Sequence, residues 1–220
     1  MGLDGPEVGP NAELREANLV GADLSGADLT FSDLTNARLD GANLAGANLG
    51  GADLTNASLD GANLAGLNLS GACLAGVKLN DEAIREVSFF MADLREVEFV
   101  SRKAEGYGYR AVLNGVDFTE ANLENVDLSL CYLLGPKLTR ANFRGASFER
   151  AKLSVRRVAE ADFGEANFCG ARWGGSVADP SGLMNSCYEI NEANFTGAIA
   201  DAATGWPEGF DPEAAGVVFK

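Results

Sequence analysis

The 220-residue chain contains no histidine. This absence removes the commonest general base, the usual ligands of zinc and the histidine-dependent nucleophile pairs of hydrolases. The sequence also lacks a Walker-type phosphate loop and a G-x-G-x-x-G segment that follows a strand. Histidine-based catalysis and the common nucleotide-binding motifs are therefore excluded.

Long apolar runs and paired cysteines are missing as well. No apolar run approaches the roughly 18 residues of a membrane-spanning helix. The first residues, from Met1 to Pro6, have neither the basic nor the apolar region of a signal peptide. The four cysteines are isolated, without a Cys-x-x-Cys motif, so we expect free thiols in a reducing cytoplasm. The cysteines are Cys73, Cys131, Cys169 and Cys187.

Positive charge is scarce. The chain has 17 Lys and Arg against 32 Asp and Glu, for a net charge of −15. A protein that binds the backbone of DNA or RNA needs the opposite sign. The composition therefore disfavours nucleic acid as a direct partner and favours a protein partner with a basic surface.

What the sequence does have is a repeat of five residues. Leu or Phe recurs at nearly every fifth position from Leu14 to Phe99 and, in a shifted register, from Leu113 to Trp173. The residue two places earlier is usually Ala. An α-helix would scatter these leucines by about 140° per repeat, and a flat strand would send them to alternate faces. A chain that turns a corner in every repeat, at Asp, Asn, Ser, Thr or Gly, points them all to one axis. On this geometry Cys131 takes an inward place and Cys73 points outward.

Three units carry a resemblance to a known family. Ala22–Gly26, Ala42–Gly46 and Ala121–Asn125 resemble the pentapeptide repeats of bacterial and cyanobacterial proteins. The resemblance implies an all-β fold, a right-handed quadrilateral β-helix with about eight coils here. It also implies a non-catalytic protein, and a core filled with Leu and Phe leaves no cleft for paired carboxylates to work in. We therefore expect no enzyme, no cofactor and no metal.

The repeat defines the domain organisation. We expect a lead-in at 1–11, a single β-helix at 12–200 and a capping tail at 201–220, because the ends of a solenoid need caps. The helix is expected to be interrupted at about 100–110 and 174–189, where the spacing of Ala and Leu is lost.

The coil geometry places particular carboxylates together. Positions 20 residues apart share a face, so Glu13, Asp33 and Asp53 are expected to stack about 4.8 Å apart. This spacing approximates the roughly 3.4 Å between phosphates of a nucleic-acid strand. Two interpretations stay open: a DNA-mimicking surface, or the repeat's own preference for Asp or Asn before the central Leu. The acidic candidates for protein interaction are Glu13, Asp33, Asp53, Asp93, Asp40 and Asp60.

The first interruption supplies a second set of candidates. Arg102, Tyr107, Tyr109 and Arg110 are residue types that anchor protein interfaces, and loops on rigid scaffolds often carry binding residues. A plain joint between two half-rods explains the interruption equally well.

Functions of three classes remain. The first is a protein-interaction scaffold. The second is a DNA mimic that binds DNA gyrase or topoisomerase IV and protects it from quinolones or toxins, as the resemblance to the gyrase-protecting subset implies. The third is an enzyme or small-molecule carrier. The N-terminal end, which shows no evident cap, could also stack on another chain and form a homodimer.

Overall fold

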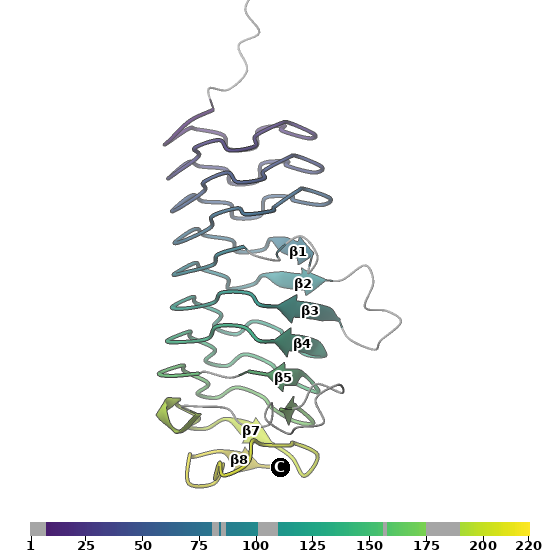
Figure 1. Ribbon diagram of the computed structural model, residues 1–220, viewed down its shortest axis with the longest axis vertical. Helices are drawn as coiled ribbons and strands as arrows, with labels where there is room; N and C mark the ends of the chain where they lie inside the picture. Colours follow the sequence, from purple (N-terminus) through teal and green to yellow (C-terminus); the bar gives the residue numbers. More distant parts are fainter. Residues whose placement is uncertain (1–7, 81–83, 85–86, 101–109, 156–157, 175–189) are drawn as a thin grey trace, which may run out of the picture.

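The computed structural model describes residues 8–80, 84, 87–100, 110–155, 158–174 and 190–220. Figure 1 shows a rod of stacked coils, with the N-terminal coils at one end and β7 and β8 at the other. Within these residues the chain forms strands, single β-bridges and turns, apart from one 3-10 helix at Ile190–Glu192. The expected all-β quadrilateral β-helix is confirmed.

The named strands are short and all pair in parallel. β1 (Lys78–Asn80) pairs with β2 (Glu98–Val100). A four-stranded sheet holds, in order, β3 (Ala111–Asn114), β4 (Cys131–Leu134), β5 (Lys152–Ser154) and β6 (Arg172–Trp173). β7 (Ile199–Ala200) pairs with β8 (Val218–Phe219). Elsewhere single parallel bridges join one coil to the next.

One bridge column runs along the rod. Eight parallel bridges in series connect Glu13 to Asn194. The step is 20 residues except from Asp93 to Asn122 and from Asp162 to Asn194, where it is 29 and 32 residues. The two long steps coincide with the expected interruptions. Residues 101–109 and 175–189, which contain most of these interruptions, lie outside the described residues, as does most of the lead-in at 1–11.

The period of five comes from one backbone conformation. The second residue after each Leu has a positive φ in every repeat from Glu16 to Gly76. Gly adopts this conformation freely and Asn tolerates it. The residue before Leu helps to form the turn, because its side-chain oxygen accepts the backbone N–H two residues later. Asp33 Oδ1 lies 2.9 Å from the Thr35 nitrogen, and Asn48 Oδ1 lies 3.2 Å from the Gly50 nitrogen.

The core changes composition along the rod. The first coils bury leucines against small alanines, whereas the last coils bury phenylalanines that stack from coil to coil. The Phe143 and Phe163 rings are 5.2 Å apart and nearly parallel, and Phe195 continues the stack at 5.1 Å. Cys131 is buried among these residues and Cys73 is exposed, as the repeat predicts.

The C-terminal tail packs on the end of the aromatic stack. The Phe210 ring lies 5.0 Å from that of Phe195, and Trp206 lies 5.4 Å from Phe168. The backbone of β8 adds a further strand beside β7. These contacts cover apolar rings at the end of the solenoid, which is what an end cap must do.

Candidate interaction site

The structure brings three of the candidate carboxylates into one column. Glu13 bridges to Asp33, and Asp33 bridges to Asp53. In the described part of the chain these are the only two bridged pairs in which both residues are acidic. Arg15 forms an ion pair with Asp33 at 2.8 Å, and no ion pair of Glu13 or Asp53 is found among the described residues. The column therefore carries a net negative charge.

In neighbouring columns, asparagine side chains stack in successive coils and form hydrogen bonds with one another or with aspartate. The Asn63 side-chain amide donates to Asn43 Oδ1 at 2.9 Å, and the Asn43 amide donates to Asp23 Oδ1 at 3.1 Å. Asn68 and Asn48 repeat this bond at 2.8 Å. An aspartate provides the turn-forming oxygen but has no amide N–H to donate. Consecutive aspartates consequently lose this ladder and place like charges one strand spacing apart.

Asp93 continues the column beyond Cys73 but is neutralised locally. Arg95 holds it with Nε 2.9 Å from Oδ1 and an Nη atom 2.6 Å from Oδ2. The hydrogen bond from the Arg95 side chain is the main reason that the pKa of Asp93 is lowered. Although Cys73 as a residue is exposed, partial desolvation of its sulfur raises the pKa of the thiol, and the charges of Asp53 and Asp93 raise it further. The thiolate form of Cys73 is therefore disfavoured.

Asp40 and Asp60 also lie on successive coils. The backbone N–H of Asp60 donates to Asp40 Oδ1 at 3.1 Å, and the hydroxyl of Ser58 donates to the same oxygen. Arg38 Nε lies 4.0 Å from Asp40 Oδ2. The carboxylate of Asp40 therefore joins two coils, whereas the carboxylate of Asp53 forms a turn within its own coil.

The structure describes only one of the four candidates from the first interruption. Arg102, Tyr107 and Tyr109 lie outside the described residues. Arg110 is half-buried and forms an ion pair with Asp127. Its proposed role as an interface anchor remains a prediction.

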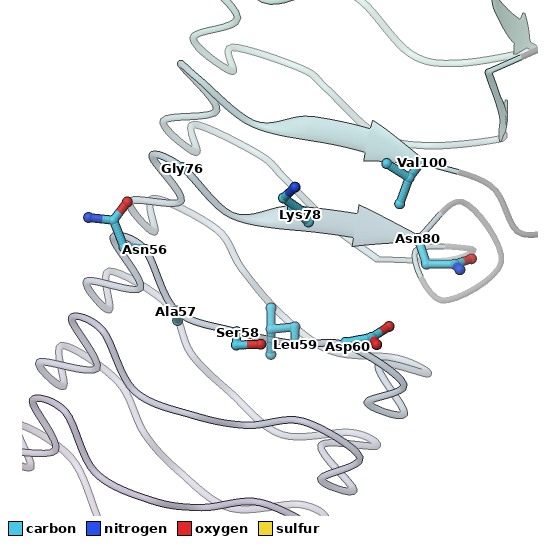
Figure 2. Close-up of a pocket in the computed structure, with 9 residues that line it drawn as sticks. All are labelled: Asn56, Ala57, Ser58, Leu59, Asp60, Gly76, Lys78, Asn80 and Val100. Atoms are coloured by element: carbon cyan, nitrogen blue, oxygen red, sulfur yellow. The ribbon is translucent and has the colours of Figure 1, made fainter.

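A groove opens in the wall between two coils, close to Asp60 (Figure 2). It has a volume of about 500 Å³ and lies between residues 56–60 and β1. Figure 2 shows Ser58 and Leu59 on one side and Lys78 on the other. The residues that line it are Asn56, Ala57, Ser58, Leu59, Asp60, Gly76, Lys78, Asn80 and Val100.

The groove marks a break in the hydrogen-bond ladder. One repeat earlier, the Leu54 N–H donates to the Cys73 carbonyl and the Cys73 N–H donates to the Ala52 carbonyl. The equivalent bonds here would run from the Leu59 N–H to the Lys78 carbonyl and from the Lys78 N–H to the Ala57 carbonyl. Neither is found among the described residues, although Ser58 keeps its bond to the preceding coil. Sequence reasoning missed this groove.

No helix with the length and apolar composition of a membrane span occurs in the described residues. They also contain no cluster of three or more potential metal-binding side chains of His, Cys, Asp or Glu.

A known protein family matches the chain. The profile described as pentapeptide repeats matches in eight copies, at residues 11–44, 42–81 and 111–154, which is more than half of the chain. No match was found among curated proteins.

Solved structures include several pentapeptide-repeat proteins that resemble the chain. HetL from the cyanobacterium Nostoc sp. strain PCC 7120, involved in heterocyst differentiation regulation, is 23% identical over 90% of both chains, with a TM-score of 0.33. A thylakoid-lumen protein of Arabidopsis thaliana is 28% identical over 51% of this chain and 72% of its own, with a TM-score of 0.36. Full-length QnrB1, a plasmid-mediated fluoroquinolone resistance protein, is 16% identical over 90% of this chain and 91% of its own, with a TM-score of 0.41.

Proposed function

The chain belongs to the pentapeptide-repeat family, and from this premise we propose that it is a non-catalytic scaffold that binds a protein partner with a basic surface. The contact surface is the carboxylate column of Glu13, Asp33 and Asp53, which we call the acidic column. Proteins of this family are generally non-catalytic, and a rod with a filled core offers its outer faces for contact.

The observation that carries this proposal is the pairing of Asp33 with Asp53 in successive coils. Asparagine at either position would keep the turn bond and add the amide ladder seen between Asn43 and Asn63. Apart from the exposed ion pair of Asp33 with Arg15, the fold gains nothing from two aspartates, and their like charges weaken it. Negative charge kept at two half-buried, solvent-accessible positions at a cost in stability supports a role in binding.

A matched pair of double variants tests the proposal. Asp33→Asn/Asp53→Asn removes two charges from the acidic column, and Asp23→Asn/Asp28→Asn removes two charges from other columns. The probe is a short synthetic peptide of alternating arginine and serine, and its dissociation constant is measured by calorimetry. We expect the first variant to bind about three- to tenfold more weakly and the second to bind nearly as the parent does. Equal affinities of the two variants would refute the column as the contact surface.

A second candidate function is mimicry of DNA toward a type II topoisomerase. It is favoured by the regular rise of the carboxylates along the rod, one per strand spacing of about 4.8 Å. On this hypothesis the protein inhibits gyrase supercoiling, or protects gyrase from a quinolone, and the effect fades with salt. A supercoiling assay with the parent and with Asp33→Asn/Asp53→Asn tests it. Absence of any effect on gyrases from several bacteria would eliminate this candidate.

A further inference from the structure

Phe31 and Met91 are large apolar residues at turn positions where the repeat usually has Gly or a polar residue. Phe31 and Met91 both have a positive φ, of 57° and 58°. Their side chains are exposed, at 69% for Phe31 and 57% for Met91. Bulky residues in this backbone region are uncommon and strained. The core gains nothing from these side chains, because both point to solvent.

The two residues lie along the same corner of the rod. The Gly51 N–H donates to the Ser70 carbonyl and the Gly71 N–H donates to the Phe90 carbonyl, so positions 31, 51, 71 and 91 follow one another from coil to coil. Phe31 and Met91 are therefore three coils apart, roughly 14 Å. Phe90, which is 38% exposed, adjoins Met91. We call Phe31, Phe90 and Met91 the apolar corner.

Glycine separates the apolar side chains and leaves the backbone open between them. The Phe31 ring lies over Gly51, where a Cβ would come within 2.5 Å of Phe31 Cε1. A Cβ on Gly71 would meet only the Gly51 backbone nitrogen, at 3.9 Å. The corner thus has an aromatic wall at one end, Met91 with Phe90 at the other and accessible backbone between. An apolar side chain of a partner fits this arrangement.

The charge beside the corner identifies the kind of partner. Asp33 and Asp53 follow Phe31 and Gly51 by two residues, so the acidic column runs next to the apolar corner. We propose that the two surfaces together dock a protein segment in which an apolar side chain is flanked by lysine or arginine. The apolar side chain seats over Gly71 between Phe31 and Met91, and a basic side chain reaches Asp53. A second copy of this chain fits poorly, because it would bring its own carboxylates to the column.

The inference rests on the proposed function, which supplies the acidic column that binds basic side chains. The apolar corner adds the preference for an apolar side chain. Phe31→Asn/Met91→Asn removes the two more exposed of the three side chains of the apolar corner and replaces them with a residue that suits a positive φ, so the variant should fold at least as well as the parent. Leu130→Asn is the matched control, because Leu130 is also exposed with a positive φ of 58° but lies in another column.

The probe is a short arginine peptide with a central Leu-Phe pair, compared with the arginine and serine peptide. We expect the apolar peptide to bind the parent about tenfold more tightly than the serine peptide. We expect Phe31→Asn/Met91→Asn to abolish this advantage and Leu130→Asn to keep it. Thermal unfolding of all variants is measured alongside.

Two results would overturn the inference: equal binding of the two peptides to the parent, or an advantage that survives in Phe31→Asn/Met91→Asn. Failure of the proposed function has a different signature. In that case the serine peptide binds Asp33→Asn/Asp53→Asn as tightly as the parent, whatever the apolar corner does.

Discussion

The side-chain amide of Asn63 donates to the side-chain oxygen of Asn43 on the preceding coil, across 2.9 Å. The same oxygen accepts the backbone N–H of Ala45, so one side chain both forms the turn and joins two coils. Asp33 and Asp53 occupy the equivalent position in the acidic column and form the turn, but neither can donate an amide N–H to the carboxylate of the preceding coil. The asparagine ladder therefore stabilises the fold, whereas the fold only tolerates the paired aspartates of the acidic column.

Opposite substitutions in the two columns should have opposite effects on stability. Asn43→Asp removes the bond to Asp23 and places two carboxylates together, so we expect it to lower the free energy of unfolding by about 1–2 kcal/mol. Asp53→Asn should raise it by up to about 1 kcal/mol, since the new amide can donate to Asp33. Urea unfolding followed by circular dichroism measures both. If Asp53→Asn destabilises the protein, the acidic column has a structural role that this account denies.

The acidic column should also control the reactivity of Cys73. Its thiol has a raised pKa because of partial desolvation of the sulfur and then because of the charges of Asp53 and Asp93. Asp53→Asn removes one negative charge, so the pKa of Cys73 should move down toward its ordinary value. Alkylation by iodoacetamide, followed by mass spectrometry as a function of pH, should then begin at a lower pH. An unchanged pH profile would mean that the Asp53 charge does not reach the thiol.

Arg95 should make the charge of Asp93 persist to lower pH. The pKa of Asp93 is lowered from 3.8, mainly by the Arg95 side chain, so the pair stabilises the folded state above about pH 3.8. This contribution is lost as the pH falls through the lowered pKa. Arg95→Gln should raise the pKa of Asp93, which NMR titration of the carboxyl carbon measures. A pKa that stays the same in the variant would assign the shift to the local turn instead.

The break in the ladder should appear in hydrogen exchange. The Leu54 N–H donates to the Cys73 carbonyl at 2.8 Å, whereas the equivalent bond of the Leu59 N–H to Lys78 is not formed. We expect the Leu59 amide to exchange at least tenfold faster than the Leu54 amide, because protection follows hydrogen bonding. Equal protection of the two amides would show that the groove is closed in solution.

The tail contacts predict a role of the last residues in stability. Phe210 is nearly buried against Phe195 and Trp206, so Phe210→Ala should cost about 3 kcal/mol. Phe219→Ala is the control, because that ring is 44% exposed and its removal should change stability by less than about 0.5 kcal/mol. Thermal unfolding distinguishes them, and a similar melting temperature for both would argue against the tail as a cap.

The five-residue period was sufficient to predict the β-helix and much of its detail. It identifies the inward alanines and leucines, the burial of Cys131 and the stacking of Asp33 on Asp53, because each follows from counting in steps of 5 or 20 residues. The period could not reveal the groove, since Leu59 and Leu79 keep their places while the backbone bonds between their coils are lost.

The apolar corner was missed for a different reason. Phe31 and Met91 fall outside the inward positions, and an isolated apolar residue on a surface is ordinary. Their common conformation and their alignment across Gly51 and Gly71 become visible only when the turn positions of successive coils are compared.

The central claim is that the acidic column binds a basic protein surface. The most direct test is the salt dependence of the affinity for the arginine and serine peptide, measured for the parent and for Asp33→Asn/Asp53→Asn. If the claim holds, the parent loses affinity steeply between low and physiological salt, and the variant shows weaker binding with a flatter dependence. Identical slopes for the two proteins would contradict it and leave the column as solvated surface.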